Sequence, residues 1–322
     1  MRSPLKLVVT LLVLAACTKN FAQYADVDPR NADVDPRTLP AQIAAEELVV
    51  HSEPAGKDWQ AWLKLAVLLQ DAGSYRESED AYRQTIALLR APDPLVVADV
   101  FDHMGTMYVT SGQLSKAEPI ERHALAIREN QRNSLGTGIS HMHLAMLFLG
   151  QNDLRSAEAE AQAAVNLLVP EYAHRPGASP ATPEEKMTAL IGLAQVRCAS
   201  GADQAAVPDL RWALQIAHQN YSDESLPVGY VEFLLGHAYW KSGNPADADR
   251  LMTEGVQKLA TVIGWGHPAY LGTLRQYEVF LVATRQRDRA QQISAEIEKL
   301  DGSRNSFTVA SGKIATTRNS PR

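Results

Sequence analysis

The sequence predicts an all-α protein, built as a right-handed solenoid of about six helix pairs. Two observations carry this prediction. Ala and Leu abound while aromatic residues make up only 7% of the 322-residue chain, a balance that favours helices. Small residues also recur with a period near 42 residues, and periods of this length are typical of repeat proteins.

The N-terminal residues 1–22 are predicted to be an export signal. Arg2 and Lys6 precede an apolar run of ten residues, Leu7 to Ala16, which is much shorter than the roughly 20 residues of a membrane-spanning helix. The four residues Leu14 to Cys17 resemble a bacterial lipobox, and the resemblance implies lipidation of Cys17. Thr18 follows that cysteine in place of Asp, so the resemblance implies anchoring in the outer membrane.

The alternative is ordinary cleavage after Ala22, which would release a soluble periplasmic or secreted chain that begins at Gln23. Residues 23–40 contain ADVDPR twice and form a predicted acidic, Pro-rich linker. Residues 301–322 are rich in Ser, Thr, Gly and Arg and are predicted to be a disordered basic tail. The repeats are expected between the linker and the tail, over residues 41–300.

Each repeat is predicted from three small-residue positions. The second helix of each pair carries one at Ser78, Ala117, Ala157, Ala206, Ala248 and Ala290. The first helix carries another twelve residues earlier, at Ala66, Gly105, Ala145, Ala194 and Gly236, with Glu278 in the sixth repeat. Five residues before the second-helix position stand Gly73, Gly112, Asn152, Gly201 and Gly243, with Arg285 in the sixth. The helix positions allow close packing, and Gly or Asn suits a left-handed helix cap between the two helices.

Two further elements complete the predicted array. Residues 41–51 add one helix in front of the first pair. A proline-rich insertion from Val169 to Pro183 lengthens the third repeat, and Thr182 with Glu185 forms a capping box that starts the next helix. Apolar residues in the middle of the helices are predicted core, namely Trp62, Leu65, Tyr82, Phe101, Leu144, Leu214, Leu235 and Leu274.

The segments AWLKLAVLLQDAGSYRESEDAYRQTIALL and LGHAYWKSGNPADADRLMTEGV resemble the tetratricopeptide repeat. The period, with Gly266 to Pro268, is similar to the kinesin-light-chain type. The resemblance covers roughly residues 59–300 and implies stacked helix pairs with a concave binding surface. It does not imply a ligand, because the asparagines of kinesin light chains and the carboxylate-clamping cations of co-chaperones are absent from the matching positions.

No catalytic or metal-binding motif stands out in the sequence, so we predict a non-enzymatic protein without cofactor or metal. His141 and His143 are the nearest metal-like pair, but two residues apart on a helix they point about 200° apart. The net charge of −6 argues against nucleic-acid binding. With only two cysteines, Cys17 and Cys198, the chain has no disulfide framework.

The repeat register predicts which side chains line the concave groove. The expected groove residues are Asp102, His103, Met142, His143, Met146, Ile191, Gln195, Phe233, His237 and Trp240. Methionine and aromatic side chains mixed with polar groups suit a protein or peptide partner. The predicted function is a protein-interaction scaffold of the bacterial cell envelope. Alternatives are a lipid-anchored component of outer-membrane, pilus or secretion assembly and, from another class, an enzyme or small-ligand sensor with a pocket between repeats.

Overall fold

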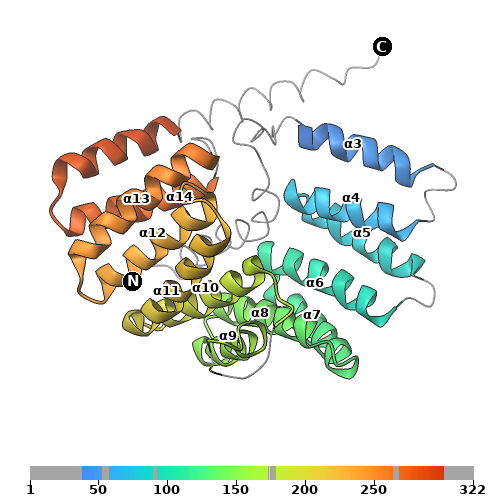
Figure 1. The fold of residues 1–322 in the computed structure, drawn as a ribbon. Helices are drawn as coiled ribbons and strands as arrows, with labels where there is room; N and C mark the ends of the chain where they lie inside the picture. Colours follow the sequence, from blue (N-terminus) through green and yellow to red (C-terminus); the bar gives the residue numbers. More distant parts are fainter. Residues whose placement is uncertain are drawn as a thin grey trace, which may run out of the picture. The chain divides into compact units, whose positions relative to one another are not determined.

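A computed structural model describes residues 38–52, 58–89, 93–172, 174, 179–263 and 268–300. This part of the chain is helical throughout and contains no β-strand (Figure 1). The predicted export signal, lipidated Cys17 and basic tail lie outside the described residues, as does nearly all of the predicted linker. No helix in the described ranges combines the length and the apolar character needed to cross a membrane.

The chain divides into two compact units, of which one spans residues 33–216. Its helices pair within each repeat, α4 with α5, α6 with α7 and α8 with α9, and consecutive first helices also contact one another. The expected extra helix, α3, packs on α4. The bounds are α3 Thr38–Val50, α4 Trp59–Asp71, α5 Tyr75–Leu88, α6 Pro94–Thr110, α7 Leu114–Asn130, α8 Ser134–Gly150, α9 Leu154–Leu168, α10 Pro183–Ala199 and α11 Asp203–Asn220.

The other unit includes residues 217–300. It takes up the last turn of α11 and continues with α12 Leu226–Lys241, α13 Pro245–Ile263, α14 Pro268–Ala283 and a final helix over residues 287–300. Helix α12 pairs with α13, and α13 also contacts α14. Each unit is therefore built from the same antiparallel helix pair.

The predicted repeat register is confirmed at both kinds of position. Every second-helix small residue from Ser78 to Ala290 is buried, as are all five first-helix partners from Ala66 to Gly236. The backbone between the helices is left-handed in all six repeats, with positive φ at Gly73, Gly112, Asn152, Gly201, Gly243 and Arg285. Arg285 adopts this conformation although it lacks the freedom of glycine, because the amide groups of Arg285 and Gln286 cap the carbonyls of Val282 and Leu281.

Most of the predicted core is buried. Leu65, Tyr82, Leu144, Leu235 and Leu274 are at most 4% exposed. The remaining three, Trp62, Phe101 and Leu214, are only half-buried. The predicted capping box before α10 is present, since Thr182 Oγ1 accepts from the amide of Glu185 and the amide of Thr182 donates to the Glu185 carboxylate.

A half-buried arginine connects neighbouring helices of the first unit. Arg197 of α10 donates to both carboxylate oxygens of Asp209, at 2.8 and 2.7 Å, and also reaches Gln162 of α9. Asp209 is fully buried and also accepts from the Tyr172 hydroxyl. Because a buried carboxylate is costly without partners, this set of bonds fixes α9, α10 and α11 against one another.

Helices α12 and α13 approach closely at three glycines. A Cβ on Gly255 would lie 2.5 Å from the carbonyl oxygen of Gly229 and 2.9 Å from the amide of Phe233. A Cβ on Gly236 would lie 2.9 Å from the amide of Met252. These neighbours are backbone atoms, which cannot turn away, so the crossing requires residues without a side chain.

Substituting Gly255→Ala therefore forces the two helices apart, and we expect the free energy of unfolding to fall by about 1–3 kcal/mol. Gly272→Ala in α14 is the matched control. Its Cβ would meet no atom within 4 Å, so the better helix propensity of Ala should stabilise by about 0.5–1 kcal/mol. Urea unfolding of both variants measures the difference; equal effects would show that the crossing at Gly255 is not tight.

Candidate functional site

The structure separates the predicted groove residues into two groups. His103, Met142, His143, Met146 and Gln195 in one unit, and His237 and Trp240 in the other, are partly exposed. Asp102, Ile191 and Phe233 are only 6%, 1% and 2% exposed. The prediction that these three line an open surface is wrong.

All three buried residues lie three positions before the first-helix small residue. The equivalent residues Leu63 and Met142 are partly exposed, so this position is buried in the second, fourth and fifth repeats and partly open in the first and third. The position one residue after the small residue is partly open in every repeat of the first unit. That row, here called the first-helix row, consists of Val67, Thr106, Met146 and Gln195.

Trp240 is held by aromatic neighbours within its unit. Its ring lies edge-on to Phe280 and His237, with ring centroids 5.5 and 5.6 Å away, and the Lys241 ammonium lies 4.1 Å above the ring centre. These contacts support an interpretation of Trp240 as a packing residue with one open edge.

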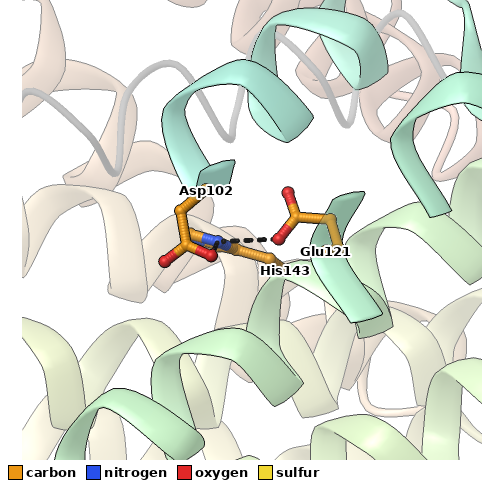
Figure 2. Close-up of side chains that lie close together, drawn as sticks. All are labelled: Asp102, Glu121 and His143. Atoms are coloured by element: carbon orange, nitrogen blue, oxygen red, sulfur yellow. Dashed lines mark ion pairs between the residues drawn. The ribbon is translucent and has the colours of Figure 1, made fainter. Parts of the chain in front are cut away.

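A cluster of ionisable side chains lies between three helices of the first unit (Figure 2). Asp102 comes from α6, Glu121 from α7 and His143 from α8. His143 Nδ1 lies 3.6 Å from Asp102 Oδ1 and 3.4 Å from Glu121 Oε2. Both carboxylates thus converge on one ring nitrogen, and we refer to these three residues as the Asp–Glu–His cluster.

The absence of a side chain at Gly105 makes room for the carboxylate of Glu121. A Cβ at Gly105 would lie 2.1 Å from Glu121 Oε1, so the carboxylate occupies the space that a side chain would fill. The small residue that the repeat needs for helix packing here also makes room for a buried acid. The side chain of Glu121 is only 1% exposed.

Arg128 holds the other edge of the Asp102 carboxylate. Its guanidinium donates to Asp102 Oδ2, to Ser140 Oγ at 2.8 Å and to Asp99 Oδ1 at 2.6 Å. Arg128 is itself buried and lies near the end of α7, between α6 and α8. Asp102 Oδ2 is therefore fixed, and Oδ1 is left to point at His143.

The inner atoms of the cluster have no hydrogen-bond partner. This is true of Asp102 Oδ1, both carboxylate oxygens of Glu121 and His143 Nδ1, each of which is inaccessible to solvent. Buried polar atoms are hydrogen-bonded in the large majority of cases. Four unpaired atoms on three neighbouring side chains therefore mark this place as unusual.

Burial and mutual interaction shift the pKa values of all three residues in the cluster. Burial raises the pKa of Glu121 to about 7, although the nearby His143 opposes the rise. Burial alone would lower the pKa of His143, but the Asp102 and Glu121 carboxylates outweigh it and raise that pKa to about 10. Burial would raise the pKa of Asp102, yet His143 and Arg128 hold it below its usual value.

Sequence reasoning placed Asp102 and His143 in the groove but missed Glu121. A signal was present in the repeat register. Glu121 lies four residues after the second-helix small residue, where the other repeats of this unit carry the buried residues Tyr82, Ala161 and Leu210. An acidic residue at a position that is buried in the other repeats of this unit implies that its carboxylate has buried partners. The expectation that His141 and His143 diverge is confirmed, since His141 instead contacts Glu160 at 2.6 Å.

The raised pKa of Glu121 predicts how the free energy of unfolding depends on pH in metal-free buffer. Glu121 is raised from 4.5 to about 7 on folding, so its protonation stabilises the fold below pH 4.5 and this contribution is lost as pH rises through 7. Wild type should lose stability relative to Glu121→Gln between pH 4.5 and 7. Chemical denaturation across this range measures the difference.

Glu160→Gln removes an acid from the neighbouring His141 pair and is the matched control. If Glu121→Gln and Glu160→Gln change the pH profile alike, the special environment of Glu121 is refuted.

Comparison with known proteins identifies the fold. No protein-family model matches the sequence, and no curated protein does either. Several solved structures are similar. A Podosopora anserina kinesin light chain with nearly identical TPR-like repeats aligns over 63% of this chain and 96% of its own, with 19% identity and a TM-score of 0.50.

Two further structures match a larger share of this chain. A Rap protein complexed with Competence and Sporulation Factor covers 85% of this chain and 82% of its own, with 12% identity and a TM-score of 0.56. A STAND ATPase with a tetratricopeptide repeat sensor, from Pyrococcus horikoshii, covers 84% of this chain but only 40% of its own, with 13% identity and a TM-score of 0.62. At these identities the likeness concerns the fold, which is the all-α repeat fold of tetratricopeptide proteins.

Proposed function

We propose that this protein is a non-enzymatic scaffold of the bacterial cell envelope, and that it binds a protein or peptide along its first-helix row. The observation that carries the proposal is the partly open first-helix row, which combines Val67 and Met146 with Thr106 and Gln195. Such a mixture of apolar and polar side chains on a rigid helical support is what a peptide-binding surface requires.

Met142 and Met146 form the apolar centre of this surface. They are one turn apart on α8, so they share one side of the helix. Helix α8 contacts both α6 and α10, which carry His103 and Gln195. Methionine is flexible and polarisable and adapts to varied apolar partners. The similar Rap protein was solved with a bound factor, which supports a binding role for a repeat fold of this kind.

Photo-crosslinking tests this surface. A photoreactive residue placed at Met146, in cells that express the full chain, should yield one dominant crosslinked protein. The matched control carries the same residue at Ala159, an exposed position on the second helix α9. Equal products from both positions would contradict the proposal, as would a hydrolase or nucleotide-turnover activity that survives purification.

The envelope location is part of the proposal and rests on residues 1–22. The apolar run and the lipobox-like Leu14 to Cys17 support export, with Cys17 as the lipidated residue. An anchored scaffold would suit the assembly of outer-membrane, pilus or secretion complexes, with the Pro-rich residues 23–40 as a spacer.

Intact mass of the mature chain, with membrane fractionation in a bacterial host, tests the location. We expect an acylated N-terminal Cys17 in the membrane fraction, and Cys17→Ala should release the chain from that fraction. A soluble chain that begins at Gln23 would instead establish a periplasmic or secreted adaptor without an anchor. A mature chain that retains Met1 would refute export.

A further inference from the structure

We infer that the Asp–Glu–His cluster is a binding site for one divalent transition-metal ion, and that Zn²⁺ fits it best. The ligands are Asp102 Oδ1, a carboxylate oxygen of Glu121 and His143 Nδ1, which all lie within 4.8 Å of one another. The site is independent of the proposed partner surface, so either proposal can fail without the other.

Two of the three distances between the ligand atoms match a tetrahedral ion. Zinc binds nitrogen and carboxylate oxygen at about 2.0–2.2 Å in tetrahedral geometry, which places two ligand atoms roughly 3.3–3.6 Å apart. His143 Nδ1 lies 3.4 Å from Glu121 Oε2 and 3.6 Å from Asp102 Oδ1. These separations are too long for good hydrogen bonds, but both equal the edge of a tetrahedron around a zinc ion.

The unpaired atoms favour a cation over a metal-free ion pair. A protonated His143 could satisfy only one carboxylate oxygen through its single Nδ1–H, and it makes a hydrogen bond to neither. Both oxygens of the fully buried Glu121 remain without a donor. One ion at the point where these atoms converge would satisfy all three residues together.

The surroundings are those of a supported site. Arg128 donates to the outer oxygen of Asp102 and is fixed in turn by Asp99 and Ser140, so the ligand carboxylate cannot rotate. Partners of this kind orient metal ligands in proteins. The side chain of His143 is 22% exposed, so the site lies close to the surface.

The donor set selects the class of ion. Calcium requires six to eight oxygen ligands and magnesium keeps several waters, so neither suits a buried site with a nitrogen donor and two acids. Imidazole with carboxylates suits zinc and its neighbours in the first transition row. Three protein ligands leave the fourth position for a water. The bound ion would tie α6, α7 and α8 together across two repeats.

Calorimetric titration of the chelator-stripped full chain with Zn²⁺ tests this site. We expect one ion per chain and a higher melting temperature with the ion bound. Glu121→Gln and His143→Asn should each weaken binding by at least roughly 100-fold, because each removes a direct ligand. X-ray absorption at the zinc edge should show only nitrogen and oxygen neighbours.

His141→Asn is the matched control, since His141 lies on the same helix but contacts Glu160 instead; it should retain full Zn²⁺ binding. Far-UV circular dichroism of metal-free Glu121→Gln, recorded below its melting temperature, shows that the variant is folded. Its loss of zinc binding then cannot reflect unfolding. Absent stoichiometric binding, or equal binding by Glu121→Gln, His143→Asn and wild type, would overturn the assignment.

Discussion

The close approach of two antiparallel helices in each repeat is the constraint on which the rest of the structure depends. Small residues at matched positions, such as Ala66 with Ser78, let the backbones meet, and Ser78 Oγ donates to the Ala66 carbonyl across that contact at 2.8 Å. The left-handed residue between the helices reverses the chain over a few residues. Once this contact is fixed, the rotation of both helices is fixed, and so is every row of side chains along them.

This constraint explains why the fold could be predicted from the sequence. Small residues and helix caps are local requirements of the backbone, so they leave a trace at fixed spacing that a single sequence reveals. Arg285 shows how strong the requirement is, since the left-handed turn persists without glycine. Such regularities involve neighbours on the same helix pair and need no knowledge of how repeats stack.

The candidate site could be predicted only in part. Residues one position apart on a helix differ by about 100° in direction, so an error of one position exchanges a surface residue for a core residue. The register alone is not sufficient either, since Ile191 is 1% exposed while Met142, at the equivalent position, is partly exposed. The members of the Asp–Glu–His cluster come from three helices and are 19 and 22 positions apart in the sequence, so no local pattern encodes their contact. The one sign of this cluster in the sequence is Glu121, an acidic residue at a position where the other repeats of the unit carry Tyr82, Ala161 and Leu210.

Arg128 has a consequence for the way the repeats come apart. Its guanidinium joins Asp99 and Asp102 of α6 to Ser140 of α8, and the removal of one partner from a buried ionic network strands the others without compensation. Helix α8 therefore cannot peel away from α6 by gradual fraying. In a repeat array, where unfolding otherwise proceeds unit by unit, this interface should rupture as a single cooperative event, which makes the second and third repeats one mechanical element.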